Sequence, residues 1–368
     1  MGRQFQLKTI TDIEAFKELH PAWDFLIENC PEKNVFLTWE WFYAWLKSYG
    51  KNTNIRIITT WEGEELVGLA PFMLLRQRKY GIAFRVLRTL SAPQCDVGGF
   101  LIKDSDPGIV AAIIDYLAAH KDEWDTIELN QFYENGYETK AAIKHITTKG
   151  FVSHQTSNRQ YYIPYENRWE DYHSSLSKNF RKNLRRCQRD MDELGNYSVR
   201  RFSGKNVTWD VIETIIEINR HATYPMIAIS EEDRALHKEL LESMAEKGWF
   251  DVYLLTLNDK PIAYEYGFLY EGCMGDWRVG FDRRTDPTLS VGVFLTMAVM
   301  KTGFAEGQRE INFLRGDEGY KNDWKPTYRE YIHFKAAHTN NPLAMLAFIW
   351  LPKIKLFFQN RRQRFDEQ

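Results

Sequence analysis

Two stretches of the chain share the same order of hydrophobic and polar segments. In the first stretch, apolar runs over residues 55–60 and 66–73 flank a short polar turn. In the second, apolar runs over residues 251–255 and 261–268 flank another. Two apolar runs joined by a short polar turn are typical of a β-hairpin, so each stretch predicts one.

The two stretches also continue alike. A third apolar segment follows each hairpin, then an amphipathic helix over residues 108–120 or 291–306, then a strand over residues 126–130 or 310–314. The repeated unit is therefore strand–strand–strand–helix–strand. Its period is too long for a solenoid of stacked repeats, so the pattern predicts two related α+β domains.

The rest of the pattern sets the expected limits of these domains. We predict an N-terminal domain over residues 1–165, a C-terminal domain over residues 166–340 and an amphipathic basic tail over residues 341–368. Residues 11–50 are predicted to be helical. The aromatic run over residues 36–46 favours packing between helix and sheet over a ligand-stacking role.

Composition narrows the class of protein. The 368 residues are 44% hydrophobic, which is enough material for two cores. A net charge of −2 excludes a global field for nucleic acid, so any anion site must be local. The four cysteines are scattered, which favours neither a zinc ribbon nor a disulfide framework. Without an apolar leader at the amino terminus, we expect a cytoplasmic protein.

A strongly basic helix follows Ser177, which can cap it. One stripe of this helix is apolar: Phe180, Leu184, Cys187, Met191 and Leu194. The opposite side carries six cations: Lys178, Arg181, Lys182, Arg185, Arg186 and Arg189. Like charges on adjacent turns repel, which favours a phosphate-bearing partner. The alternative is a solvated face balanced by the acidic residues that follow, Asp190, Asp192 and Glu193.

A second candidate anion site lies before the predicted helix over residues 291–306. Arg283 and Arg284 belong to the loop, and Ser290 stands at its end. Unpaired backbone amides at a helix N-terminus attract anions, and Gly292 would let a phosphate approach the backbone. The alternative is an ordinary capped helix.

A loop dense with ionisable groups follows the last predicted strand, over residues 312–324. Loops at strand ends commonly hold catalytic groups. Lys321 could stabilise an oxyanion or contact a phosphate, while Asp317 or Glu318 could accept a proton from an attacking amine or hydroxyl. The alternative is a turn in which Lys321 pairs with a neighbouring carboxylate.

Three of these segments together resemble a known family. Residues 176–186, 290–292 and 313–324 are similar to the corresponding motifs of bacterial GNAT-type acyltransferases of the CelD-like group, which are related to the FemAB aminoacyl transferases. The similarity covers about residues 20–340, and the motif over 313–324 is the most specific. It implies tandem GNAT-like domains, each with a mixed, largely antiparallel sheet flanked by helices.

The resemblance also implies a reaction, the transfer of an acyl group from a thioester to an amine or hydroxyl. A splayed strand around residues 275–280, including Trp277, would receive the pantetheine arm. The helix N-terminus at Ser290, Val291, Gly292 and Val293, with Arg283 and Arg284, would receive the pyrophosphate. The co-substrate would be acyl-CoA, with acetyl-CoA first, and no metal is expected. Because this loop has only Gly292, a carrier-protein or aminoacyl-tRNA donor stays open.

The resemblance assigns Lys321 to the reaction centre. The candidates for the base are Asp317, Glu318 and Glu265, in that order. We expect the substrate to contact basic and aromatic side chains: Lys178, Arg181, Arg185, Tyr320 and Trp324. The sequence has neither a P-loop nor an HExxH motif nor a nucleophile elbow, which favours direct attack by the acceptor on the thioester.

The tail combines an apolar run over residues 343–351, too short to span a bilayer, with five cations that follow it: Lys353, Lys355, Arg361, Arg362 and Arg364. One interpretation is contact of residues 343–364 with the inner face of the membrane. The other is a last helix packed on the domain with a basic end.

The leading functional hypothesis is therefore acyl transfer to an envelope polysaccharide precursor or lipid. The alternatives are an aminoacyl-tRNA-dependent transferase, the one case in which we expect a nucleic-acid partner, and a non-catalytic GNAT-like binding module. The N-terminal copy is expected to be structural, because its late strand runs into residues 130–135 without a lysine.

Overall fold

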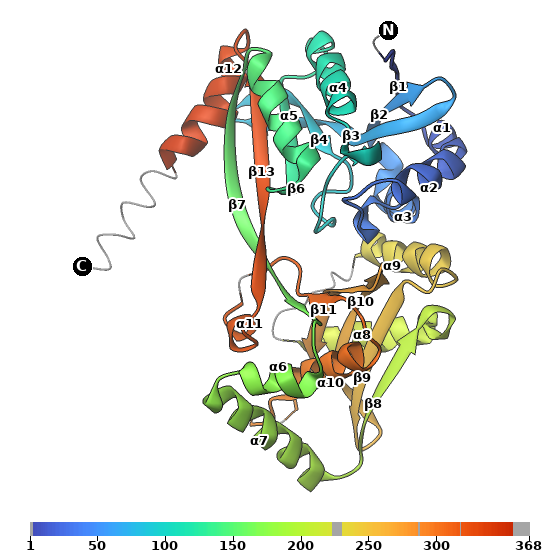
Figure 1. Cartoon of the computed structure of the whole chain (residues 1–368), viewed down its shortest axis with the longest axis vertical. Coiled ribbons are helices and arrows are strands. Elements are labelled where there is room, and N and C mark those ends of the chain that lie inside the picture. Colours follow the sequence, from blue (N-terminus) through green and yellow to red (C-terminus); the bar gives the residue numbers. More distant parts are fainter. Residues whose placement is uncertain (1–2, 223–229, 286–287, 317, 356–368) are drawn as a thin grey trace, which may run out of the picture. The chain divides into compact units, whose positions relative to one another are not determined.

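The structure is a computed structural model that describes residues 3–222, 230–285, 288–316 and 318–355 (Figure 1). The repeat predicted from the sequence is present. The first copy consists of β2 (Asn54–Glu62), β3 (Glu65–Lys79), β4 (Ile82–Thr89), α4 (Pro107–Ala119) and β6 (Thr126–Tyr133). The second consists of β9 (Phe250–Leu257), β10 (Lys260–Tyr270), β11 (Cys273–Phe281), α10 (Val291–Ala305) and β12 (Glu310–Asn312).

Both copies use the same strand pairing. The hairpins β2–β3 and β9–β10 are antiparallel, whereas the strand after the helix pairs in parallel with the third strand: β4 with β6, and β11 with β12. A parallel pair requires a crossover, which α4 and α10 supply. The predicted α+β class and the mixed, largely antiparallel sheets are thus confirmed.

The chain forms two compact units. Unit 1 comprises residues Met1–Leu46, Gly50–Asn158 and Glu330–Gln368, and unit 2 comprises Lys47–Tyr49 and Arg159–Arg329. Two long strands, β7 (Phe151–Pro164) and β13 (Thr327–His338), contribute residues to both units. The first unit therefore takes in residues from near the end of the chain.

The strand order in unit 1 is β1–β2–β3–β4–β6–β13, where β1 is Gln6–Ile10, and the short strand β5 (Leu101–Ile102) pairs with β3. The helix α4 and the following α5 (Tyr137–Thr148) pack on one face of this sheet, against Leu87, Ile127 and Phe334. The predicted helical region near the amino terminus contains α1 (Ile13–Glu18), α2 (His20–Glu28) and α3 (Trp39–Tyr49). Its tryptophans are buried, as expected for core.

The other face of this sheet is covered by the last described helix. It begins with α12 (Pro342–Ala344), runs through a π-helical segment (Met345–Trp350) and continues to residue 355. Its Phe348 packs against Phe84 and Val86 of β4. Since side chains alternate across a strand, Val86 and Leu87 point to opposite faces, and the helix lies opposite α4.

The strand order in unit 2 is β7–β12–β11–β10–β9–β8, where β8 is Tyr197–Ser203. One face packs against α10 and the basic helix α7 (Lys178–Leu194), with α6 (Trp169–Ser175) alongside α10. The other face carries α8 (Trp209–Arg220) and α9 (Glu231–Met244). Tyr264 on β10 reaches Asn219 of α8, whereas the next residue, Glu265, reaches Thr296 of α10.

The basic helix forms as predicted. The hydroxyl of Ser177 accepts a hydrogen bond from the Phe180 amide at 3.1 Å, which caps α7. Four of the five predicted apolar positions are buried: Phe180, Leu184, Cys187 and Met191. The fifth, Leu194, is exposed because it is the last helical residue, directly before the left-handed Gly195 (φ 62°).

In the part of the chain that the structure describes, no helix combines the length and the apolar character needed to cross a bilayer.

Candidate active site

The strands β11 and β12 separate shortly after they begin. Their parallel ladder joins Cys273–Gly275 to Glu310–Asn312. Beyond it β12 ends, whereas β11 continues to Phe281. Asp276 is the first residue of β11 past the ladder, so it stands at the fork between the two strands. A buried carboxyl at such an opening is unusual enough to mark a candidate site.

Asp276 has a second buried carboxyl group near it, that of Glu265 on β10. Thr296 of α10 donates its hydroxyl hydrogen to Oε1 of Glu265. Oε2 of Glu265 and Oδ1 of Asp276 are also buried, and neither has a hydrogen-bond partner among the described residues. These two oxygens are therefore available for further hydrogen bonds in the interior of unit 2.

Burial changes the acidity of both groups. It raises the pKa of Glu265 well above its usual range, and the nearby charge of Asp276 acts in the same direction. Burial also raises the pKa of Asp276, to about 7, against the opposing effect of the Lys321 ammonium group. Both carboxyl groups therefore hold their protons to higher pH than exposed carboxyl groups do, and Asp276 exchanges its proton near neutral pH.

A bulge in β10 brings the two strands close at this point. The register with β11 shifts between Tyr266 and Phe268, and Gly267 lies in the shift. A Cβ atom at Gly267 would stand 1.9 Å from the carbonyl oxygen of Gly275. Only glycine lets the backbones approach so closely, so Gly267 fixes the geometry next to Asp276.

Lys321 lies in the short helix α11 (Tyr320–Asp323) and is buried. Its Nζ donates to the carbonyl oxygens of Phe313 at 3.1 Å and Gly316 at 3.0 Å, and forms an ion pair with Glu318 at 2.8 Å. The alternative expected from the sequence, a pair with a neighbouring carboxylate, is therefore present. Asp317 lies outside the described residues.

Tyr165 and Tyr320 lie near the two buried carboxyl groups, whereas Trp324 lies in the core. Tyr165 is half-buried overall, but its hydroxyl oxygen is fully buried and has no hydrogen-bond partner within the described ranges. Burial raises the pKa of Tyr320, with a further contribution from Asp276. Trp324 is fully buried, its ring 4.9 Å from that of Phe180 and perpendicular to it, so it belongs to the core beneath the loop.

The predicted pyrophosphate seat is partly occupied by an internal ion pair. Asp282, which is buried, accepts hydrogen bonds from Nε (2.9 Å) and Nη2 (2.6 Å) of Arg284. The Arg284 guanidinium holds the pKa of Asp282 well below its usual range. The charge of Arg284 is thus balanced within the protein, while Arg283 is exposed.

The N-terminus of α10 has no side-chain cap. Ser290 precedes Val291 without a side-chain cap hydrogen bond, while the Val291 amide donates to the Leu289 carbonyl oxygen at 2.9 Å. Val291 is buried and Val293 half-buried. A Cβ atom at Gly292 would meet only the Phe281 ring, at 3.8 Å, so glycine is not sterically required there.

Trp277 lies apart from this group. Its ring packs on Tyr266, Phe268 and His237, with centroid separations of 5.7, 5.3 and 5.5 Å. These contacts belong to the α8–α9 face of the sheet, whereas Asp276, the preceding residue, faces the α10 side.

The cations of α7 divide into two groups. Arg186 and Arg189 form ion pairs with Asp190 and Glu193, at 3.0–3.9 Å. Arg181 is half-buried, whereas Lys178, Lys182 and Arg185 are exposed. The carboxyl end of the basic face is therefore balanced as the sequence alternative expected, and the amino end carries the exposed cations.

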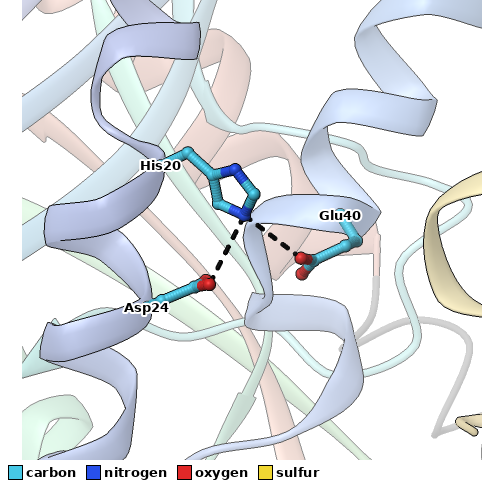
Figure 2. Close-up of side chains that lie close together, drawn as sticks. All are labelled: His20, Asp24 and Glu40. Carbon is cyan, nitrogen blue, oxygen red and sulfur yellow. Dashed lines mark hydrogen bonds and ion pairs between the residues drawn. The ribbon is translucent and has the colours of Figure 1, made fainter. Parts of the chain in front are cut away.

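Unit 1 contains a separate polar triad (Figure 2). Nε2 of His20 lies 3.4 Å from Oδ2 of Asp24 and 3.3 Å from Oε1 of Glu40, and the imidazole stacks on Trp39 at 3.8 Å. Within the described residues, this is the one group of three such side chains with ligand atoms within 4.8 Å of one another. The imidazole interacts with both carboxylates, which accounts for the arrangement, and we treat the triad as structural.

Sequence reasoning missed Asp276, Thr296 and Tyr165. A signal for Asp276 was present, since a carboxylate stands alone in the apolar strand Cys273–Phe281. A charged residue inside a buried strand is rare without a function or a partner. Thr296 and Tyr165 carried no comparable signal, because both residue types are common in helices and strands.

Comparisons with known proteins identify the domain and the fold that contain this site. Residues 178–322 match the family model described as "Acetyltransferase (GNAT) domain". No curated protein matches the chain.

Among solved structures, the chain is similar to FemX, with a TM-score of 0.64 and 12% identity over 93% of this chain and 99% of that one. It is also similar to the C-terminal domain of a putative lysylphosphatidylglycerol synthetase from Agrobacterium fabrum, with a TM-score of 0.54 and 9% identity over 90% of this chain and 95% of that one. A third similar structure is L-PGS from Bacillus licheniformis, with a TM-score of 0.52 and 11% identity over 92% of this chain and 96% of that one. At these identities the likeness shows the fold. Residues 178–322 are thus a GNAT acetyltransferase domain, and the chain as a whole is similar in fold to FemX.

Proposed function

We propose that unit 2 transfers an acyl group from acyl-CoA directly to an amine or hydroxyl group of its acceptor. One observation carries the proposal: at the fork between β11 and β12, Asp276 has a pKa raised to about 7 and lies near Glu265, whose pKa is also raised. A base is most effective when its pKa lies near the working pH. Asp276 therefore replaces Asp317 and Glu318 as the first candidate for the base.

The proposed chemistry needs no covalent enzyme intermediate. The lone pair of the acceptor attacks the thioester carbonyl carbon, and the proton of the acceptor passes to the Asp276 carboxylate. The carbon–sulfur bond then breaks, and the thiolate leaves and takes up a proton. Lys321 favours the ionised form of Asp276, which supports its role as an electrostatic residue of the site. Glu318, half-exposed and paired with Lys321, is a weaker candidate for the base.

The donor is proposed to bind at the N-terminus of α10. The N-terminus of α10, which has no side-chain cap, and the exposed Arg283 suit a pyrophosphate, whereas the charge of Arg284 is already balanced by Asp282. The acceptor is proposed to be an envelope polysaccharide precursor or a lipid. The exposed Lys178, Lys182 and Arg185 of α7 support an acceptor that carries phosphate.

The same three cations keep an aminoacyl-tRNA donor as the second candidate. Activity that ribonuclease abolishes would select tRNA, and activity with acyl-CoA in the presence of ribonuclease would select the thioester. A third possibility is a binding module without catalysis, which would retain full biological function after Asp276, Glu265 and Lys321 are all replaced.

Calorimetric titration with CoA, acetyl-CoA and a long-chain acyl-CoA tests the donor. The Arg283→Ala/Arg284→Ala variant should lose at least about tenfold in affinity. Arg76→Ala/Arg78→Ala, which removes two exposed arginines of β3 in unit 1, is the matched control and should bind as the parent does. If the parent protein binds none of the three compounds, the thioester donor is wrong.

Transfer should be tested separately from binding. We expect Asp276→Asn to bind the donor normally and to lose transfer, because only the proton acceptor is removed. Equal transfer by this variant and the parent would exclude Asp276 as the base.

A further inference from the structure

The helix that ends the described chain has an exposed apolar stripe. Leu343, Leu346, Trp350 and Ile354 keep between 47% and 53% of their surface exposed. They follow one another at spacings of three and four residues, so they share one side of the helix. Four large apolar side chains in a row on a surface helix are uncommon in a protein that touches only water.

This stripe is not the packing side of the helix. The opposite side is formed by Ala344, Ala347, Phe348 and Ile349, which are buried against the sheet of unit 1. The helix is therefore held by one apolar side and presents a second to the outside. Figure 1 shows it beside the strand β13.

A second exposed apolar feature adjoins the helix, although it is distant in sequence. The turn between β3 and β4 carries Tyr80, 66% exposed, and Ile82, 40% exposed. Nζ of Lys79, in the same turn, lies 4.4 Å from the ring centroid of Phe348 in the helix. The turn and the helix therefore lie near each other, and we call their exposed apolar side chains together the apolar edge: Tyr80, Ile82, Leu343, Leu346, Trp350 and Ile354.

The two stretches of chain that form the apolar edge carry only cations, and the nearby Glu128 of β6 is already paired with Lys335 and Arg88. No Asp or Glu occurs between Glu65 and Asp96, or between Glu330 and Asp366. The same stretches contain two cations next to aromatic rings of this helix, Lys79 at Phe348 and Lys353 at Trp350. Burial together with the ammonium groups of Lys353 and Lys335 lowers the pKa of His154, which reflects the local positive potential.

We propose that the apolar edge binds the surface of an anionic lipid bilayer. Aliphatic and aromatic side chains enter the boundary between headgroups and acyl chains, while flanking lysines and arginines bind the lipid phosphates. Trp350, with the Lys353 ammonium 5.4 Å from its ring, has the amphipathic character that suits this depth. The proposal does not depend on the donor or acceptor of unit 2.

Charge distinguishes a bilayer from a second copy of the chain. In a symmetric dimer built on the apolar edge, the same patch of each copy would face the other. Lysines and arginines would then meet their own counterparts, with no carboxylate of these stretches to balance them. An anionic lipid surface supplies the opposite charge, so it fits this patch better.

Cosedimentation of the full chain with lipid vesicles tests the proposal. We expect binding to vesicles that contain about 30% phosphatidylglycerol in phosphatidylcholine, and at least about tenfold weaker binding to phosphatidylcholine alone or in high salt. Leu346→Glu/Trp350→Glu should abolish binding, and Tyr80→Ser/Ile82→Ser should weaken it several-fold. Phe25→Glu, which changes an exposed phenylalanine of α2, should bind as the parent does.

Unchanged thermal midpoints would show that the variants fold, which is expected because the substituted side chains are exposed. Failure of the parent to bind anionic vesicles, or full binding by Leu346→Glu/Trp350→Glu, would overturn the proposal. So would a dimer, seen by sedimentation velocity without lipid, that this double variant dissociates, because the edge would then serve a second copy. CoA titration of the same samples keeps this result separate from the function of unit 2.

Discussion

The ammonium group of Lys321 donates a hydrogen bond to the carbonyl oxygen of Gly316, 3.0 Å away, across the loop that follows β12. A second bond reaches Phe313 at the start of the loop. Adding a Cβ atom to Gly316, whose φ is 119°, would place that atom 2.3 Å from the Glu318 carboxylate. Lys321 thus closes a tightly folded loop and also acts electrostatically on Asp276.

Replacement of Lys321 by methionine should therefore have two effects. The carbonyl oxygens would lose their donor, which we expect to lower the free energy of unfolding by about 1–3 kcal/mol. Loss of the charge should reduce kcat/KM by about 100-fold or more. Urea denaturation measures the loss in the free energy of unfolding, and steady-state kinetics measures the loss in kcat/KM. Lys325→Met, an exposed position nearby, is the control. Lost stability with intact transfer would make Lys321 purely structural.

The pH dependence of transfer should report Asp276. Because the carboxylate form accepts the proton, kcat/KM should rise with pH through about 7, the pKa of Asp276. The Lys321 charge favours the carboxylate form of Asp276, so Lys321→Met should move this rise in kcat/KM, the acidic limb of the pH profile, to higher pH. Asp276→Asn should remove it. A limb that stays in place in both variants would belong to another group.

Gly267 should tolerate no side chain. In Gly267→Ala the new Cβ would overlap the carbonyl oxygen of Gly275, and the strands must separate to relieve the contact. We expect a loss of about 3 kcal/mol in the free energy of unfolding. Gly319→Ala is the matched control, since nothing lies within 4 Å of a Cβ atom there and φ is −54°. Similar stabilities for the two variants would contradict the close approach of β10 and β11.

His237 should make stability depend on pH. It is buried beside Tyr266, whose hydroxyl lies 3.1 Å from its Nδ1, and burial lowers its pKa to about 3. Between about pH 3 and 6.5 the unfolded chain therefore binds the extra proton, and stability is lost as pH falls. Above pH 6.5 its contribution is complete.

His237 alone can change the free energy of unfolding by at most about 1.4 kcal/mol per pH unit. The raised pKa values of Glu265 and Asp276 act in the opposite direction, because the folded state then holds the additional protons. The comparison should therefore be between the parent and His237→Gln, measured by urea denaturation at pH 7.5 and 5. The variant should lose less stability on acidification; an equal loss would mean that His237 is not the responsible group.

The repeated unit was predictable because it rests on local patterns. Hairpins such as β2–β3 and β9–β10 join adjacent apolar runs across short turns. The apolar side and the basic side of α7 can both be read directly from the sequence. These features need no knowledge of distant partners. The same holds for Lys321, whose loop is built from neighbouring residues.

The site was less predictable because it depends on distant contacts and on burial. Glu265 was a candidate, but the significance of Asp276 appears only when β12 ends and leaves the fork. The internal pairing of Arg284 with Asp282 could not be read from charge alone, since the sequence does not fix which way an arginine side chain turns. Trp277 looked like part of the donor site until strand alternation placed it with His237.

Unit 1 combines segments that are far apart in the sequence, which affects when its sheet can be completed during synthesis. Its strand β6 pairs with β13 through residues 331–336, and Phe84 of β4 is covered by the helix that contains Phe348. Both partners are synthesised after residues 159–329 of unit 2. During synthesis, the strand β6 therefore keeps an unpaired edge until all of these residues have been made.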